Sequence, residues 1–292
     1  MRFGLVGTGY WARTVHAAGL AAHPDVELVG VWGRDLAKAS AVAEPLEAAG
    51  FDDYASFLGA VDAVSFAVPP SVQVPAALEA AAAGKHLLLE KPIATNLADA
   101  DALVEAATDV ASVVFFTSRF VPVWEEWLES MAARALLGSQ IDWLSSLDTP
   151  GNPYAASVWR REEGALWDVG PHAMSLVLPM LGPIVDIVAT GGRRDLVHLV
   201  LTHESGATST MSISMTVPPD AQRWKVEVYD EQGWHAQPHD PRDLGAAYGR
   251  AVSALVEAAT SGTPHPCDIR FGRDVVEVLA RCEAVLSSET TS

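Results

Sequence analysis

Cysteine is scarce in this sequence, and its placement argues against two kinds of site. Only Cys267 and Cys282 are present, and both lie far from any Cys-x-x-Cys or histidine-rich segment of the kind that holds zinc. They are also poorly placed for the disulfide framework of a small secreted domain. We therefore expect two buried or incidental thiols, and we expect no bound metal.

Long apolar runs are missing as well. Nowhere do about 18 apolar residues follow one another, which a membrane-spanning helix would need. The first residues, MRFGLVGTG, pass directly into a glycine turn and lack the apolar segment and small-residue cleavage site of a secretory signal. The sequence therefore predicts a protein that crosses no membrane and stays in the cytoplasm.

Basic residues are outnumbered by acidic ones. The chain has 19 Lys and Arg against 37 Asp and Glu, a formal net charge of −18. An excess of this sign repels phosphate backbones and anionic lipids, and no basic cluster overrides it. We expect neither nucleic acid nor a membrane surface as a partner, and we interpret the acidic surface as a solubility feature.

Apolar residues, by contrast, are plentiful and fall in short runs. They make up 49% of the 292 residues. Because single domains commonly contain about 100–200 residues, a chain of this length is expected to form two domains.

The first part of the chain alternates between strand and helix patterns. Apolar runs at 2–6 and 26–31 flank an alanine-rich stretch at 11–22 with helical character, which together predict a β-α-β unit. The alternation continues through helices at about 35–49, 72–83 and 96–107 and strands at 61–67, 86–90 and 112–117. Continuously apolar strands that are each followed by a helix indicate a doubly wound parallel sheet covered on both faces. We assign this first domain to residues 1–118.

After about residue 120 the pattern changes. Helices are expected at 122–136 and 171–181, and strands at 140–147, 185–191, 196–203, 207–216 and 224–230. The sequences ESGA and DEQG are hairpin signals, so residues 119–292 are predicted to form an α+β domain with a mostly antiparallel sheet. A closing helix at about 272–287 would pack on one of the two domains.

A glycine-rich turn follows the first predicted strand. In the segment GTGYWA (7–12) the first glycine makes the tight turn, the second lets the backbone approach a pyrophosphate, and the helix start supplies N–H groups for its charge. This strand, turn and helix context indicates a Rossmann dinucleotide-binding domain. The predicted contacts are Gly7, Thr8, Gly9, Tyr10 and Trp11.

The end of the second predicted strand bears on the choice of cofactor. An NAD-specific domain places an acid there, on the ribose 2′-hydroxyl, but this chain has Gly33, followed by Arg34 and, one turn on, Lys38. An arginine fork binds a 2′-phosphate, so NADP is favoured over NAD. The alternative is that Asp35 serves as the ribose acid, although Asp35 also suits the N-cap of the next helix.

Several segments together resemble the glucose–fructose oxidoreductase/inositol dehydrogenase (Gfo/Idh/MocA) family, over nearly the whole chain. Besides GTGYWA, these segments are AVPPSVQ (67–73), AGKHLLLEKP (83–92), SRF (118–120) and WRREEGALWDVGPH (159–172). The resemblance implies that Lys91 lies beside the nicotinamide and the reacting carbon, and that Asp168 and His172 come from the second domain to complete the site. A parallel sheet binds its ligand outside the carboxyl ends of its strands. The charged residues that follow the apolar run HLLL are therefore expected to lie where the ligand binds.

The family resemblance supplies further candidates. Val68, Pro69, Gln73, Glu90 and Arg119 are expected to contact the cofactor, with Arg119 also lining the substrate pocket. Aromatic residues at 143, 154 and 159, namely Trp143, Tyr154 and Trp159, are candidates for a sugar-facing wall, although such residues are more often part of a core.

These residues predict an NAD(P)-dependent dehydrogenase that acts on a secondary alcohol or ketone of a sugar, cyclitol or related polyol. His172 is the expected general acid/base, Lys91 would polarise the substrate oxygen, and Asp168 would orient His172 or hold a substrate hydroxyl. The alternative is a non-catalytic dinucleotide-binding sensor of the same fold. Alternating polar and apolar residues in the second-domain sheet, together with the resemblance, predict a homodimer or homotetramer formed through that sheet.

Overall fold

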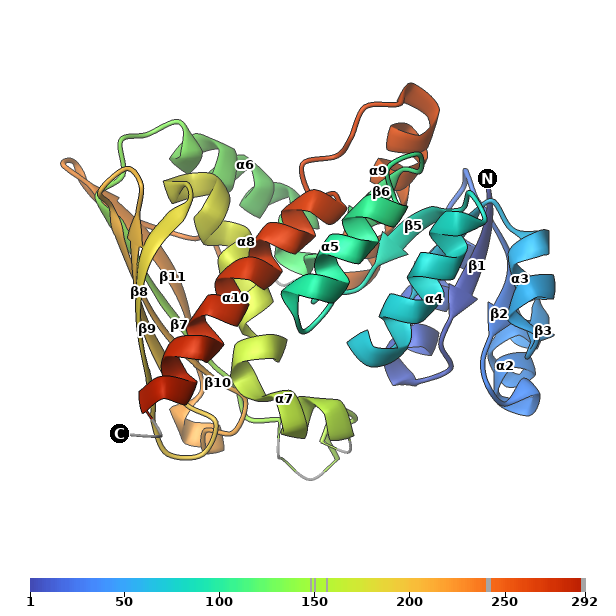
Figure 1. The fold of residues 1–292 in the computed structure, drawn as a ribbon, viewed down its shortest axis with the longest axis horizontal. Helices are drawn as coiled ribbons and strands as arrows, with labels where there is room; N and C mark the ends of the chain where they lie inside the picture. Colours follow the sequence, from blue (N-terminus) through green and yellow to red (C-terminus); the bar gives the residue numbers. More distant parts are fainter. Residues whose placement is uncertain (148, 150, 156, 240–242, 290–292) are drawn as a thin grey trace. The chain divides into compact units, whose positions relative to one another are not determined.

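The computed structural model describes residues 1–147, 149, 151–155, 157–239 and 243–289 (Figure 1). The chain divides into two compact units. The first comprises Met1–Val121 and Arg242–Asp274, and the second comprises Pro122–Pro241 and Val275–Ser292. In the described residues, no helix is long and apolar enough to cross a membrane.

The first unit is built on a six-stranded sheet with the order β3-β2-β1-β4-β5-β6. All its neighbouring strands pair in parallel, as the sequence predicted. The chain adds β2 and then β3 on one side of β1. It then adds β4, β5 and β6 on the other side of β1. The strands are β1 (Arg2–Val6), β2 (Glu27–Trp32), β3 (Ala49–Phe51), β4 (Ala63–Phe66), β5 (His86–Leu89) and β6 (Ser112–Val114).

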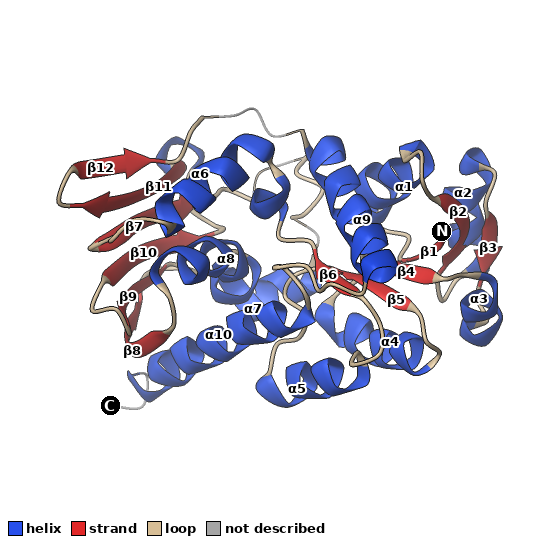
Figure 2. Cartoon of the chain, turned by 90° about the horizontal axis from the view of Figure 1, so that it is seen from above, coloured by secondary structure: helices blue, strands red, loops and turns tan. Residues whose placement is uncertain are grey.

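Helices cover both faces of this sheet, which is why its central strands are continuously apolar. Figure 2 shows α1, α2 and α9 on one face and α3, α4 and α5 on the other. The doubly wound arrangement is therefore confirmed. The helices are η1 (Ala12–Ala17), α1 (Ala18–Ala22), α2 (Leu36–Ala43), η2 (Glu44–Leu46), α3 (Tyr54–Ala60), α4 (Pro70–Ala82), α5 (Leu97–Ala106), η3 (Thr117–Phe120) and α9 (Leu244–Ser261).

The segment between β2 and β4 contains more elements than the sequence predicted. The single helix expected at 35–49 ends as α2 at Ala43, and the chain then turns through η2, where Glu47 has a φ of 60°. This turn leads into the short strand β3 and then into α3, whose N-cap Asp53 accepts a hydrogen bond from the amide of Ser56 at 2.8 Å. The capping aspartate was the sequence signal for this missed helix.

Helix α9 belongs to the first unit, whereas the sequence-based division placed every residue after 118 in the second domain. It packs against α1 and against β5 and β6. Tyr248 on this helix is fully buried, and its ring lies 5.3 Å from that of Phe115. A segment remote in sequence thus covers one face of the parallel sheet, which no local pattern could reveal.

The second unit contains a mixed six-stranded sheet with the order β12-β11-β7-β10-β9-β8. Only the β7–β10 pair is parallel, so the prediction of a mostly antiparallel sheet is confirmed. Both hairpin signals form hairpins, β9–β10 and β11–β12. The strands are β7 (Gly138–Leu144), β8 (Ile184–Gly191), β9 (Val197–His203), β10 (Thr208–Ser214), β11 (Arg223–Asp230) and β12 (Gly233–Ala236).

One face of this second sheet packs against helices. Side chains of β9 alternate, with Leu199 and Leu201 buried and Val200 exposed. The outward face carries large exposed apolar side chains, among them Val188 and Trp234. The helices that belong wholly or mainly to this unit are α6 (Pro122–Ala132), α7 (Val158–Asp168), α8 (Gly170–Leu181) and α10 (Ile269–Glu289).

Candidate active site

The glycine turn lies directly after β1, at the carboxyl edge of the parallel sheet. Gly7 has a φ of 132°, and a Cβ there would lie 2.5 Å from the carbonyl oxygen of Ala67. At Gly9 the situation is the reverse, because a Cβ would meet no heavy atom within 4 Å. Gly7 is thus required by the fold, while Gly9 keeps space open at the start of the first helix. The residues present therefore fit the pyrophosphate of a dinucleotide.

The loop after β2 lies against this turn. A Cβ on Gly33 would come within 2.8 Å of Cγ2 of Thr8, which accounts for a small residue at that position. Asp35 caps α2, since its Oδ1 accepts hydrogen bonds from the amides of Ala37 (3.1 Å) and Lys38 (3.2 Å). Its Oδ2 lies 3.5 Å from Nζ of Lys38. The carboxylate of Asp35 is therefore engaged by its own helix.

Arg34 stands between these two residues and is exposed. In the described part of the chain no ion pair involves its guanidinium, whereas Lys38 has Asp35 beside it. Arg34 and Lys38 were both predicted to contact the 2′-phosphate of the cofactor. Of the two, Arg34 is the one whose charge is not offset by a neighbouring carboxylate.

The segment Glu90-Lys91-Pro92 follows β5 at the same edge of the sheet, with a cis peptide bond between Lys91 and Pro92. The buried amide of Gln73, on α4, holds this turn. Its Oε1 accepts from the amide of Glu90 (2.9 Å), and its Nε2 donates to the carbonyls of Glu90 (2.9 Å) and Pro92 (3.2 Å). Gln73, predicted as a cofactor contact, therefore fixes the backbone that carries Lys91.

The side chain of Glu90 reaches the glycine turn and also turns back on its own segment. Its Oε1 accepts a hydrogen bond from Nε1 of Trp11 at 2.6 Å. Its Oε2 accepts from the amide of Lys91 at 3.1 Å. Glu90 thus joins the predicted cofactor turn to the predicted catalytic lysine.

Three further predicted residues lie at the ends of neighbouring elements of the same unit. Val68 and Pro69 link β4 to α4, and Cγ1 of Val68 lies 3.3 Å from the Cβ position of Gly7. Arg119 lies in η3 after β6, with its guanidinium carbon 5.4 Å from the ring centre of Phe271. The carboxyl ends of β1, β2, β4, β5 and β6 thereby gather the predicted cofactor residues of this unit.

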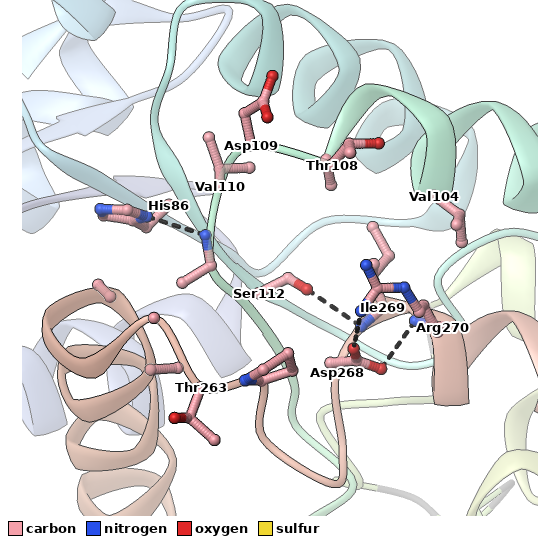
Figure 3. Close-up of a pocket in the computed structure, with 16 residues that line it drawn as sticks. His86, Val104, Thr108, Asp109, Val110, Ser112, Thr263, Asp268, Ile269 and Arg270 are labelled. Atoms are coloured by element: carbon pink, nitrogen blue, oxygen red, sulfur yellow. Dashed lines mark hydrogen bonds and ion pairs between the residues drawn. The ribbon is translucent and has the colours of Figure 1, made fainter.

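A separate hollow of about 230 Å³ lies at the opposite edge of the same sheet (Figure 3). His86 and Ser112 lie in it at the amino ends of β5 and β6, next to the start of α10. Nδ1 of His86 accepts from the amide of Ala111 (3.0 Å), and Oγ of Ser112 accepts from the amide of Ile269 (3.1 Å). These polar groups serve the backbone, so this hollow is not part of the candidate site.

In the second unit Asp168 and His172 lie where two helices meet. Asp168 is the last residue of α7, and α8 begins at Gly170 with Pro171 in its first turn, close to the helix start that the sequence indicated. Within α7, Gly164 has a φ of 71°, which breaks the helical run. The structure thus presents Asp168 at a helix end.

Arg160 is a functional candidate that the sequence reasoning missed. Its Nε donates to Oδ2 of the buried Asp168 at 3.1 Å. Its guanidinium carbon lies 4.9 Å from the ring centre of Tyr154 and 5.1 Å from that of Trp159. Two predicted sugar-wall residues therefore pack on the arginine that holds Asp168. The adjacent basic residues in WRREEG were the available signal.

His172 lies against an aromatic cluster on the inner face of the second sheet. Its ring stacks on Trp143, with centres 5.2 Å apart and an interplanar angle of 17°. Trp143 also contacts Trp224, with ring centres 3.6 Å apart. The carbonyl of His172 accepts a hydrogen bond from Oγ of Ser175 at 2.8 Å. Trp143, predicted as part of a sugar wall, is buried and supports the histidine ring.

The requirements of a metal site are not met in the described ranges. In them, no group of three or more His, Cys, Asp or Glu side chains is arranged to hold an ion. Cys267 and Cys282 are both buried free thiols.

The sequence is similar to families and individual proteins that are already known. Residues 1–118 match a family described as an oxidoreductase family with an NAD-binding Rossmann fold, and residues 135–235 match the GFO/IDH/MocA C-terminal domain. An uncharacterized oxidoreductase of Synechocystis is 31% identical over 78% of this chain and 69% of its own length. A dTDP-3,4-didehydro-2,6-dideoxy-alpha-D-glucose 3-reductase of Streptomyces antibioticus is 26% identical over 95% of both chains.

The fold has a counterpart among solved structures. The UDP-N-acetylglucosamine 3-dehydrogenase of Acidithiobacillus ferrooxidans superposes with a TM-score of 0.83, covering 99% of this chain and 98% of its own, at 24% sequence identity. At this identity the likeness is one of fold.

Proposed function

Because the chain belongs to the Gfo/Idh/MocA family of oxidoreductases, we propose that it transfers a hydride between a nicotinamide and a secondary alcohol or ketone of a sugar, cyclitol or related polyol. The observation that carries the proposal is the clamped Glu90-Lys91-Pro92 turn beside the glycine turn. It fixes a lysine at the edge of the sheet where we expect the cofactor to bind. The whole-length similarity to a dTDP-sugar reductase supports a sugar-type substrate.

The bound nicotinamide would supply or accept the hydride, and the protein would supply orientation and a proton. We assign to Lys91 the polarisation of the substrate oxygen, because an ammonium stabilises negative charge that develops there. Gln73 and Glu90 hold the lysine backbone in place, so that the charge is preorganised.

We assign the proton transfer to His172, because imidazole is the side chain best suited to take up and release a proton in general acid/base catalysis. The flat contact with Trp143 restrains the imidazole ring. Asp168 would hold a substrate hydroxyl or orient His172, with its carboxylate fixed by Arg160. Tyr154 and Trp159, which pack on Arg160, would form part of the wall that faces the sugar.

For the cofactor we propose a preference for NADP over NAD. The exposed Arg34 is available to a 2′-phosphate, while Asp35 is turned into the N-terminus of α2. A guanidinium forms charge-assisted hydrogen bonds with a phosphate that it cannot form with a hydroxyl. We also propose a cytoplasmic homodimer or homotetramer, formed through the outward face of the second sheet, where Val188 and Trp234 are exposed.

The test is a substrate panel of free sugars, cyclitols and nucleoside-diphosphate sugars, run with NADP and NAD in both directions and followed by absorbance of the reduced nicotinamide. Activity that disappears in the Lys91→Ala variant is the expected result. A panel without turnover, together with tight cofactor binding, would support the sensor alternative instead.

A further inference from the structure

The first helix of the parallel domain contains an unusual turn. Residues Ala12–Ala17 form a π-helix between Trp11 and α1. Single π-turns inside α-helices are rare and are found frequently at functional sites. This one directly follows the glycine turn.

The π-turn changes which side chains share a face of the helix. In an α-helix, residues five apart are separated by about 140° around the axis, because each residue advances about 100°. In a π-helix, hydrogen bonds run between residues five apart, so these residues lie closer to one face of the helix. Trp11 and His16 are such a pair, and their rings meet edge to face with centres 6.3 Å apart.

Both side chains contact the same carboxylate oxygen, Trp11 as a donor and His16 as a donor in the tautomer that carries its proton on Nε2. Nε1 of Trp11 lies 2.6 Å from Oε1 of Glu90, and Nε2 of His16 lies 3.0 Å from the same atom. The His16 side chain is fully buried and Glu90 is largely buried, so a carboxylate without these donors would be costly there.

The other ring nitrogen of His16, Nδ1, is hydrogen-bonded to a buried serine. Nδ1 lies 2.9 Å from Oγ of Ser65 on β4, and that hydroxyl lies 2.8 Å from the phenol oxygen of the buried Tyr248 on α9. The His16 ring also packs on Tyr248, with centres 4.5 Å apart. The imidazole therefore has one orientation that satisfies both of its nitrogens.

We propose that His16 and Trp11 are positioning residues that act on the catalytic turn through Glu90. They hold one oxygen of the Glu90 carboxylate, which leaves the other oxygen to bind the amide of Lys91 at 3.1 Å. The π-turn is the backbone feature that lets Trp11 and His16 contact the same oxygen of Glu90. The inference rests on the role proposed above for Lys91.

The test compares two substitutions of one residue. His16→Gln keeps a donor near the position of Nε2 and can still reach Glu90. His16→Asn keeps a polar group only near the position of Nδ1, facing Ser65. His16→Asn should lower kcat by about 10–100-fold, the effect that a small misplacement of a catalytic group produces, with little change in KM or cofactor Kd. His16→Gln should restore most of the loss.

Trp11→Phe removes the second donor while it keeps an aromatic ring, and it should lower kcat in the same way. His86→Gln, at the opposite edge of the sheet, serves as the matched control and should leave kcat unchanged. Hydrogen exchange at the Lys91 amide gives a readout that needs no substrate. Exchange should be about tenfold faster in His16→Asn and close to wild type in His16→Gln, because a lost hydrogen bond opens the amide to solvent.

Unchanged kcat and unchanged exchange in His16→Asn would overturn the inference. Equal losses in His16→Gln and His16→Asn, with equally lowered melting temperatures, would also overturn it, since they would indicate a purely structural role. If the wild type turns over no substrate, the exchange comparison still decides whether His16 fixes the turn, and the proposed function alone fails.

Discussion

Arg160 and Asp168 are joined by an ion pair, with Nε of the arginine 3.1 Å from Oδ2 of the aspartate. The pair spans the break in α7 at Gly164, so it ties the two parts of that helix together. Asp168 is buried, and the arginine is packed on two aromatic rings. The position of the aspartate therefore depends on a residue that the sequence reasoning did not select.

Replacement of Arg160 should test this dependence. Arg160→Met keeps much of the apolar contact but leaves the buried carboxylate without its charged donor, which should cost about 1.5–3 kcal/mol of unfolding free energy. Denaturant titration measures the loss. Arg161→Met, at the neighbouring and exposed position, is the control. Equal stability of the two variants would show that the ion pair contributes little.

Lys91→Ala and His172→Ala should each lower kcat by about 10²–10⁴-fold, because both residues are assigned to the substrate oxygen and its proton. The cofactor Kd should change far less, and calorimetry with the oxidised cofactor checks this. Lys85→Ala is a matched control, since Nζ of Lys85 donates to the carbonyl of Val61 at the other edge of the sheet. Near-normal turnover in either variant would remove that residue from the mechanism.

Cofactor choice should depend on Arg34. NADP is expected to bind at least about tenfold more tightly than NAD, a difference that about 1.4 kcal/mol provides. Arg34→Ala should remove most of the preference. Asp35→Asn keeps a good N-cap but loses the negative charge, so it should strengthen NADP binding further. Calorimetric titration of both cofactors separates the contributions, and tighter NAD binding that is unaffected by Arg34→Ala would contradict the assignment.

Stability should fall in mild acid, in part because of a buried histidine in the second sheet. Burial lowers the pKa of His203, whose Nδ1 lies 2.8 Å from the carbonyl of Gly182 and whose Nε2 lies 2.7 Å from Oγ of Ser209. Below a pH of about 6.5 the unfolded chain binds a proton that the folded chain resists, so the unfolding free energy decreases as the pH falls toward the lowered pKa. Above that pH both states are neutral and the contribution is constant.

Melting curves between pH 7.5 and pH 5 check the histidine effect. Burial also lowers the pKa of His86 and of His265 in the first unit, so the wild type should lose stability through all three residues. His203→Asn should flatten the pH dependence without abolishing it. A variant with an unchanged slope would exclude His203 as a contributor.

Self-association through the second sheet should be visible in sedimentation at micromolar concentration. The outward face exposes Val188 and Val200, which pair across β8 and β9, with relative exposures of 57% and 44%. Val188→Glu combined with Val200→Glu should dissociate the assembly, because charges buried at an interface without partners are costly. Val158→Glu, at an exposed position on α7, is the control. A wild type that sediments only as a monomer would rule out this assembly.

The sequence by itself determined the alternation of strands and helices, the glycine turn and the lysine that follows an apolar strand. These features depend on neighbours close in the chain, because hydrophobic periodicity, turn geometry and helix starts are local properties. Gly7 could therefore be placed in a tight turn from the sequence alone, whereas the catalytic role of Lys91 stays a prediction.

Only the tertiary structure decided the groups that hold these residues in place. Gln73 meets Glu90 across α4 and β5, and Tyr248 reaches Ser65 from a helix nearly two hundred residues later. The pairing of Trp11 with His16 needed a π-turn, which the hydrophobic pattern does not encode. Contacts of this kind arise when the parallel sheet and its covering helices pack, and packing brings together residues whose separation in sequence carries no signal.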